Sequence, residues 1–263
     1  MTDRDLYNEV KEILLSSGTE DASFDARQIV NASSAFENSR ETALEFARRR
    51  ASHEPLQYIL GTWEFMGIEF MVTPAVLIPR ADTETLCEFA LSKLKGIPSP
   101  TVFDLCAGSG CIGLSLAKLS GALVTLFEKS HEAAAVLRQN RDTVSPTSKV
   151  VECDVLTCPL PTAAADMIVC NPPYIKSGVI NTLSREVKKE PLMALDGGED
   201  GLLFYREIAA RWKPALKTGG TLAFEIGYDQ RSEVTDIMTE AGYKNVMFLR
   251  DLGGNDRVVY GNK

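Results

Sequence analysis

The chain is 263 residues long, which fits either one large domain or a catalytic domain with a smaller appendage. Its hydrophobic fraction of 44% and charged fraction of 24% are ordinary for a soluble globular protein, and no stretch approaches the roughly 20 apolar residues that a membrane span needs. With a formal net charge of −8, the chain lacks the basic footprint of a protein whose main ligand is DNA or RNA. We therefore expect no membrane partner and no direct contact with nucleic acid.

The N-terminal segment and the cysteines both indicate a cytoplasmic protein. The segment MTDRDLYNEVKEILL mixes charges of both signs and has no apolar run after a basic start, so it predicts neither a secretory signal nor a transit peptide. The six cysteines form no C-x-x-C pair, and only two histidines are present to complete a site, so we expect no metal. Most of these cysteines lie in or beside apolar runs, as reduced core thiols do.

Helical periodicity runs through the first sixty residues. Apolar residues recur at helical spacing in three segments, at Leu6, Val10, Ile13 and Leu14, then at Phe24, Ile29 and Val30, and then at Leu44, Phe46 and Ala47. Gly18 and the cluster 31–34 are typical of breaks between helices. We predict a small helical bundle over residues 1–60, in which the run from Arg48 to Arg50 is a solvated helix end.

A short linker, residues 61–79, follows the predicted bundle. In TWEFMGIEFMV, aromatic and branched residues flank Gly67, which predicts a β-hairpin. In VLIPRADTETL, Pro79 ends an extended run, and Asp82 is placed to cap a helix that continues to about Lys95.

Residues 80–263 show the rhythm of an α/β domain. The strand-like runs are TVFDL, ALVTLF, KVVEC, DMIVC, TLAFEI and YKNVMFL, and the first two are followed by helical segments from about Cys111 and Ser130. Strands that are apolar on both faces and joined by helices predict a doubly wound, mostly parallel sheet. The ligand site of such a sheet lies at the carboxyl ends of its strands.

A glycine-rich turn joins the first of these strands to its helix. It reads Cys106, Ala107, Gly108, Ser109 and Gly110, and its glycines let the backbone turn sharply and approach a ligand at the helix N-terminus. The stretch from Gly108 to Gly113 also satisfies G-x-G-x-x-G, so an NAD-type dinucleotide site remains an alternative at this point.

Acidic residues end the next two strands. Glu128 is placed to accept hydrogen bonds from both ribose hydroxyls of a nucleoside, which again fits either cofactor. Asp154 is placed to accept from an adenine amino group while Val155 covers the ring, although a surface acid and a core valine explain these two residues nearly as well.

The segment Asn171-Pro172-Pro173-Tyr174 separates the cofactor alternatives, because a dehydrogenase has no evident use for it. Two successive prolines remove two N–H donors and stiffen the loop. The Asn171 side-chain oxygen and the Pro172 carbonyl are then placed to accept the two hydrogens of one planar NH₂ group, with the Tyr174 ring stacked on its face. This arrangement predicts an amide or an exocyclic amine as the reacting group.

With these loops on one sheet, the chain resembles class I S-adenosylmethionine-dependent methyltransferases that act on nitrogen. Within that class it closely resembles the HemK/PrmC-type glutamine methyltransferases of peptide chain release factors. The resemblance covers nearly the whole chain, and the segments that carry it are 77–84 (LIPRADTE), Asn171 to Tyr174, 190–192 (EPL) and 255–257 (NDR). The family's cofactor loop usually reads Gly-x-Gly-x-Gly, whereas this chain has Cys106 at the first position.

The resemblance implies a fold, a cofactor and a set of site residues. The fold is a sheet of seven strands with a small N-terminal helical domain, and the cofactor is S-adenosylmethionine, which becomes S-adenosylhomocysteine. Residues 106–110 would surround its methionine end, Glu128 its ribose, and Asp154 with Val155 its adenine. Arg80 and Thr83 would close the site over the cofactor.

The resemblance also implies a substrate. Asn171 to Tyr174 would hold the glutamine of the Gly-Gly-Gln loop of class I release factors, with the helical region adding recognition of the protein and the enzyme acting as a monomer. An adenine amino-group methyltransferase acting on DNA or RNA would share the Asn-Pro-Pro-Tyr segment, but the acidic balance favours a protein substrate.

Overall fold

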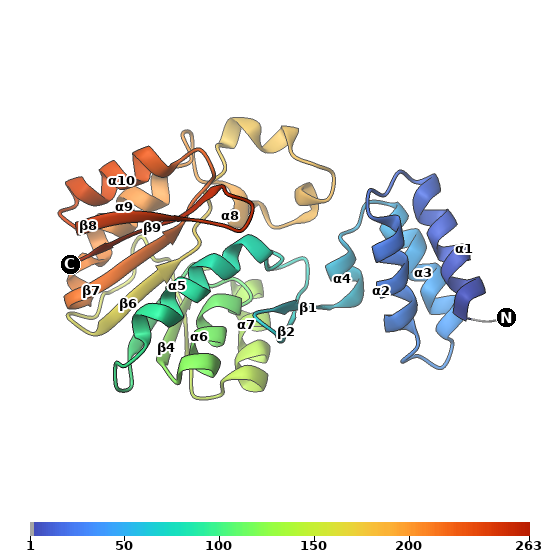
Figure 1. The fold of residues 1–263 in the computed structure, drawn as a ribbon, viewed down its shortest axis with the longest axis horizontal. Coiled ribbons are helices and arrows are strands. Elements are labelled where there is room, and N and C mark those ends of the chain that lie inside the picture. Colours follow the sequence, from blue (N-terminus) through green and yellow to red (C-terminus); the bar gives the residue numbers. More distant parts are fainter. Residues whose placement is uncertain (1–2) are drawn as a thin grey trace.

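A helical region and a larger sheet region lie at opposite ends of the molecule in the computed structural model, which describes residues 3–263 (Figure 1). The helical region, which the sequence predicts, consists of α1 (Asp3–Ser16), α2 (Ala22–Ser33), α3 (Ser39–Ala51) and the short α4 (Leu56–Leu60). Its core is formed by the apolar stripes of the first three helices, with Val10, Leu14, Ala26, Ile29 and Ala47 fully buried. This core is separate from the cores of the sheet region.

The basic end of α3 differs from the prediction at one position. Arg48 is exposed, as expected for a solvated helix end, but Arg50 is buried. The Arg50 Nε atom donates to Asp25 of α2 at 2.6 Å, and its Nη1 atom lies 2.8 Å from Glu186 of the sheet region. The expectation was wrong for Arg50 because two carboxylates from distant segments meet its guanidinium.

The predicted hairpin is present. Strands β1 (Thr62–Phe65) and β2 (Ile68–Met71) pair antiparallel, with Phe65 opposite Ile68. Both turn residues, Met66 and Gly67, have positive φ angles of 53° and 71°, which a two-residue type I′ turn requires. The hairpin is anchored on the sheet region, because the Asn140 side chain of α7 (His131–Val144) bonds both the N–H and the carbonyl of Met71, at 2.8 and 3.0 Å.

Seven strands form the main sheet. They are β3 (Thr101–Leu105), β4 (Leu123–Glu128), β5 (Lys149–Glu152), β6 (Ala165–Cys170), β7 (Leu216–Glu225), β8 (Lys244–Arg250) and β9 (Asp256–Asn262). Their order is β5-β4-β3-β6-β7-β9-β8, and β9 runs antiparallel to both of its neighbours. The predicted mostly parallel sheet is therefore confirmed, and β9 is the strand that the apolar runs did not reveal.

Helices cover both faces of the sheet, as expected of a doubly wound fold. Helices α5 (Glu84–Leu94), α6 (Cys111–Ser120) and α7 (His131–Val144) lie on one face, and α9 (Leu203–Trp212) and α10 (Arg231–Glu240) lie on the other (Figure 1). Successive side chains of β3 point to opposite faces of the sheet. Val102 therefore packs in the core beneath α5, α6 and α7, and Phe103 packs in the core beneath α9 and α10. Phe103 meets Trp212 edge to face, with ring centroids 6.3 Å apart.

Short elements fill the loops at the carboxyl ends of the strands. They are η1 (Ala81–Thr83), η2 (Ser177–Thr182), η3 (Val187–Lys189) and α8 (Leu192–Leu195), while η4 (Lys213–Ala215) precedes β7. The predicted capping role of Asp82 is wrong, because Asp82 lies inside η1 and the residue that precedes α5 is Thr83. The Asp82 carboxylate instead accepts from Arg257 of β9 at 3.1 Å.

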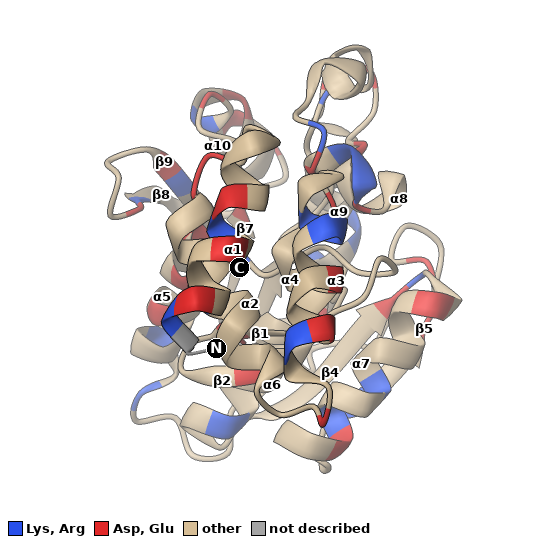
Figure 2. Cartoon of the chain, turned by 90° about the vertical axis from the view of Figure 1, so that its right-hand side faces the viewer, with Lys and Arg blue, Asp and Glu red and all other residues tan. Residues whose placement is uncertain are grey.

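Charge is mixed on the face that carries the N-terminal helices, where acidic and basic segments are interspersed (Figure 2). Among the helices of residues 3–263, none is long and apolar enough to cross a membrane.

Candidate active site

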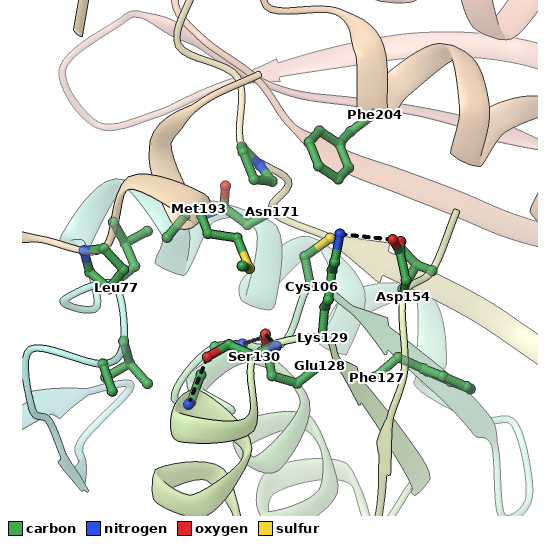
Figure 3. A pocket seen from close by; sticks show the side chains of 18 of the residues that line it. Leu77, Cys106, Phe127, Glu128, Lys129, Ser130, Asp154, Asn171, Met193 and Phe204 are labelled. Atoms are coloured by element: carbon green, nitrogen blue, oxygen red, sulfur yellow. Dashed lines mark hydrogen bonds and ion pairs between the residues drawn. The ribbon is translucent and has the colours of Figure 1, made fainter. Parts of the chain in front are cut away.

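A cavity opens at the carboxyl ends of β3, β4, β5 and β6, where the fold predicts a ligand site. Its cavity volume is about 130 Å³. Asn171 and Met193 lie on one side of it and face Glu128 and Ser130 on the other (Figure 3). The lining residues are Ala75, Val76, Leu77, Cys106, Gly108, Phe127, Glu128, Lys129, Ser130, Ala133, Cys153, Asp154, Val155, Asn171, Pro173, Pro191, Met193, Ala194 and Phe204.

The glycine-rich turn bends through left-handed backbone at three positions. The φ angles of Cys106, Gly108 and Gly110 are 58°, 55° and 82°. Nothing lies within 4 Å of the place where a Cβ on Gly108 would be, so the backbone is open to the cavity there, whereas a Cβ on Gly110 would collide with Leu137. Glycine is therefore needed at the two positions for different reasons. At Gly108 it leaves the backbone accessible to a ligand, and at Gly110 it avoids a collision with a closely packed side chain.

A buried carboxylate holds this turn to the start of α6. Asp104, at 1% exposure, accepts from the N–H of Gly113 at 2.8 Å, and a Cβ on Gly113 would lie only 2.7 Å from the same oxygen. Burial raises the pKa of Asp104 to about 7, an effect that the Gly113 hydrogen bond only partly offsets. Gly113 is the third glycine of the G-x-G-x-x-G pattern, and its close contact with Asp104 explains why glycine is found there.

Glu128 spans the two loops that flank the cavity. One carboxylate oxygen accepts from the N–H of Gly108 at 2.8 Å, and the other accepts from the N–H of Ser130 at 2.7 Å. Each oxygen of an ionised carboxylate has two lone pairs, so both can accept a further hydrogen bond from a ligand in the cavity. The Ser130 hydroxyl in turn caps α7 by accepting from Ala133 at 3.2 Å.

Asp154 and Val155 lie beside Glu128 in the loop after β5. Burial disfavours ionisation of Asp154, but hydrogen bonds from Lys129 at 2.9 Å and from the Leu156 N–H at 2.9 Å outweigh it, so the pKa of Asp154 is lowered. Val155 is 4% exposed, and its carbonyl accepts from Trp212 at 2.9 Å. Together with Phe127 and Phe204, which also line the cavity, this corner offers both an apolar surface and an anionic acceptor.

The Asn-Pro-Pro-Tyr segment is divided between the cavity and the protein behind it. Asn171 and Pro173 line the cavity, whereas Pro172 is buried and Tyr174 does not line it. Burial raises the pKa of Tyr174, whose phenol lies near Arg257 and Glu225, and its carbonyl accepts from Gln230 at 3.0 Å. Tyr174 therefore does not contribute to the surface of the cavity, where the sequence predicts that its ring would stack on the NH₂ group.

Neither Arg80 nor Thr83 lines the cavity. Arg80 forms an ion pair with Glu190, a buried carboxylate that also accepts from the N–H of Ile78 at 3.2 Å. Thr83, at 2% exposure, receives a hydrogen bond from the Asn171 Nδ2 atom at 3.4 Å. The remaining residues predicted for the cofactor loop that do not line the cavity are Ala107, Ser109 and Gly110.

Several residues that line the cavity are not among the site residues predicted from the sequence. Lys129 and Ser130 follow Glu128 directly, so their position next to the predicted ribose acceptor was an available signal. Pro191 belongs to the Glu190-Pro191-Leu192 segment that carried the resemblance, but Met193 and Phe204 gave no local signal. Their place in the cavity depends on how α8 and α9 fold over the sheet.

Known proteins are similar to this chain in sequence and in fold. Residues 80–199 match the family described as the methyltransferase small domain. The release factor glutamine methyltransferase of Clostridium botulinum is 39% identical over 86% of this chain and 82% of its own length, and that of Caulobacter vibrioides is 35% identical over 98% and 95%.

Solved structures of lower identity share the fold. A methyltransferase from Pyrococcus furiosus superposes with a TM-score of 0.55 at 16% identity, over 76% of this chain and 90% of that one. The hMettl16 catalytic domain superposes with a TM-score of 0.60 at 17% identity, over 86% and 81%. The sequence relationships go further than the fold and show that the chain belongs to the release factor glutamine methyltransferase family.

Proposed function

We propose that the protein transfers a methyl group from S-adenosylmethionine to the side-chain amide nitrogen of the glutamine in the Gly-Gly-Gln loop of class I release factors. The observation that carries this proposal is the position of Asn171 and Pro173 in the same cavity as Gly108, Glu128 and Asp154. One cavity thereby presents acceptors for a nucleoside and an acceptor for an amide.

The residues on the strand ends fit the proposed cofactor. Glu128 has acceptor capacity left for ribose hydroxyls, and Asp154 is anionic beside an apolar corner suited to an adenine ring. The open backbone at Gly108 lets a ligand approach closely. When bound, S-adenosylmethionine supplies a methyl group on a positively charged sulfur. We propose that Cys106 to Gly110 surround this end of the cofactor, with Arg80 and Thr83 supporting the wall from behind.

Asn171 and its neighbours act on the substrate amide. An amide nitrogen is a weak nucleophile because its lone pair is delocalised into the carbonyl, so most of the rate must come from positioning. The Asn171 side-chain oxygen and the Pro172 carbonyl accept the two N–H hydrogens of the glutamine, and this aims the nitrogen at the methyl group. The same hydrogen bonds stabilise the positive charge that develops on nitrogen during transfer. Pro173 and Tyr174 keep this loop rigid, and the proton leaves to water after transfer.

We further propose that residues 1–60 recognise the release factor as a protein, that residues 61–79 link them to the catalytic domain of residues 80–263, and that the enzyme works as a cytoplasmic monomer. In support of the first point, α1 to α4 contribute no residue to the cavity lining, while Arg50 and His53 contact the segment that leads into it. The family relationship favours glutamine over the adenine amino group of DNA or RNA as the target.

The decisive experiment incubates the full-length protein with S-adenosylmethionine and a class I release factor and locates the added mass by fragment mass spectrometry. We expect one methyl group, on the glutamine of the Gly-Gly-Gln loop, and none when that glutamine is replaced by alanine. Methylation elsewhere, or tight binding of NAD in place of S-adenosylmethionine in calorimetry, would refute the proposal.

A further inference from the structure

A buried carboxylate lies directly behind Asn171. Glu225 is the last residue of β7, whose residue Phe224 pairs with Cys170 of β6 in the parallel register, and Asn171 follows Cys170. The Glu225 side chain is 1% exposed and does not line the cavity. The mechanism above gives no role to this residue, although an acid is costly to bury without a reason.

The surroundings of Glu225 indicate the orientation of the Asn171 side-chain amide. Hydrogen bonding by the Thr83 hydroxyl and by the Asn171 amide favours the ionised form of Glu225 and so opposes the effect of burial on its pKa. Because an ionised carboxylate only accepts, Asn171 must present its NH₂ group to Glu225. The Asn171 Nδ2 atom also donates to Thr83 Oγ1 at 3.4 Å, so both partners take the nitrogen side of the amide. The amide oxygen is therefore left as the group that faces a ligand.

The electrostatic setting of Glu225 allows its charge to vary. Burial raises its pKa to about 7, although Thr83, Arg257 and Asn171 all favour the ionised form. Among residues 3–263, its Oε2 atom finds no hydrogen-bond partner. One oxygen of the ionised Glu225 carboxylate is therefore left without a hydrogen bond from the described part of the chain.

Other titratable groups interact electrostatically with Glu225. They are Arg257 on β9, Asp82 on η1, Cys170 at the end of β6, Tyr174 in the loop after β6, Tyr205 on α9, Cys87 on α5 and Cys111 on α6. Burial raises the pKa of each of these thiols and phenols. A second buried acid, Asp104, also has a pKa of about 7, so a pH profile must distinguish it from Glu225.

We propose that Glu225 is a positioning residue for methyl transfer: together with Thr83 it fixes the Asn171 amide with its oxygen toward the substrate, and its negative charge strengthens that oxygen as an acceptor. This inference rests on the proposed function, because it assumes that Asn171 holds the amide that is methylated. Glu225 acts through Asn171 and does not itself touch the substrate.

Glu225→Gln tests this role because it keeps the shape of the side chain and removes its charge. We expect the single-turnover rate of methyl transfer to fall roughly 10- to 100-fold, the usual cost of losing a partner that orients a functional side chain, with cofactor affinity unchanged. The wild-type rate should rise with pH through about 7, since the ionised carboxylate is the better acceptor. This rise should be absent from the Glu225→Gln profile, an outcome that a merely structural role would not produce.

The experiment uses the full-length protein, S-adenosylmethionine and a release factor, between about pH 5.5 and 8.5. Glu233→Gln, an exposed glutamate on α10, serves as the matched control and should keep the wild-type rate and profile. Thr83→Val and Thr83→Ser form a second pair, in which we expect the valine to lower the rate and the serine to restore it because only serine keeps the hydroxyl.

Each outcome separates the alternatives. A Glu225→Gln protein with the wild-type rate would overturn the inference, and one that is slow but keeps the rise through about pH 7 would overturn it as well and assign the titration to Asp104. If Glu225→Gln fails to fold, a Thr83→Val protein with the wild-type rate would overturn it instead. A wild-type protein that methylates no release factor would refute the proposed function, and the inference with it, before any variant is compared.

Discussion

The two sides of the cavity are built from different kinds of contact. On the cofactor side, backbone N–H groups hold the loops that follow the strands, as when Gly108 and Ser130 donate to Glu128. On the amide side, the Asn171 amide donates to the side chain of Thr83 and favours the ionised form of Glu225. The cofactor side depends on the shape of the backbone, and the amide side depends on a network of side chains.

This difference predicts different responses to mutation. Removing a side chain on the cofactor side should change binding, because we propose that the groups there contact the cofactor. Removing one on the amide side should change the rate, because positioning of a weak nucleophile is the main source of catalysis. The helical region is linked to the amide side, since Arg50 reaches Glu186 and His53 lies 3.1 Å from Arg185.

The largest effect is expected at Asn171. Asn171→Ala removes the acceptor that we propose orients the amide, and loss of one such preorganised group typically costs on the order of 100- to 1000-fold in turnover. The loss should appear in single-turnover methylation, with the melting temperature and most of the cofactor affinity kept. Asn181→Ala, an exposed asparagine on η2, is the control. A near wild-type rate for Asn171→Ala would remove the amide clamp from the mechanism.

Asn171→Asp sharpens the same comparison. The new carboxylate would stand beside Glu225 and could no longer donate to it, so the two acids would repel each other. We expect this protein to gain activity as the pH is lowered, because protonation of one acid relieves the repulsion, whereas the wild-type rate should fall in that direction. Parallel pH profiles for the two proteins would contradict the contact between residue 171 and Glu225.

A second large effect is expected where the helical region meets the amide side. Arg50→Ala leaves Asp25 buried without its partner, and breaking a buried ion pair in this way typically costs about 3–5 kcal/mol. Denaturant unfolding should show this loss in the helical region, while Arg48→Ala at the exposed neighbouring position should change little. We also expect slower methylation of the intact release factor with unchanged cofactor binding, and a weakened cofactor affinity would contradict the separation of the two sides.

On the cofactor side, Glu128→Ala removes both the proposed ribose acceptor and the partner of two backbone N–H groups. We expect the dissociation constant for S-adenosylhomocysteine to rise about 10- to 100-fold, as is usual when buried donors lose a charged partner. Calorimetry measures the change, with Glu240→Ala on α10 as an exposed control. Release-factor binding should be much less affected, and an unchanged cofactor constant would exclude Glu128 from the site.

The smallest effect is expected at Cys106, where a side chain occupies left-handed backbone at a φ of 58°. Glycine adopts this conformation without steric cost, so Cys106→Gly should stabilise the fold by about 1 kcal/mol and leave cofactor binding nearly unchanged. Cys153→Gly, at a cavity position without positive φ, should destabilise it. Denaturation midpoints that move in the same direction for both variants would show that the backbone at Cys106 is not strained.

The sequence by itself determined the features that depend on neighbouring residues. The apolar runs TVFDL and DMIVC predicted β3 and β6, and the glycine-rich turn predicted the start of α6, because strand alternation, left-handed turns and helix starts are properties of a few adjacent residues. The Asn-Pro-Pro-Tyr segment likewise pointed to a planar nitrogen before the sheet was known. Family membership followed from the same motifs.

Tertiary structure alone decided the features that depend on distant partners. Strand β9 owes its place to pairing with β7 and β8 on either side, and Arg50 became buried because Asp25 and Glu186 converge on it. In the sequence, Glu225 is one acid inside an apolar run, and nothing near it indicates that it will meet the Asn171 amide. The energy of such a contact comes from removing both groups from water together. A short stretch of sequence does not indicate this joint burial.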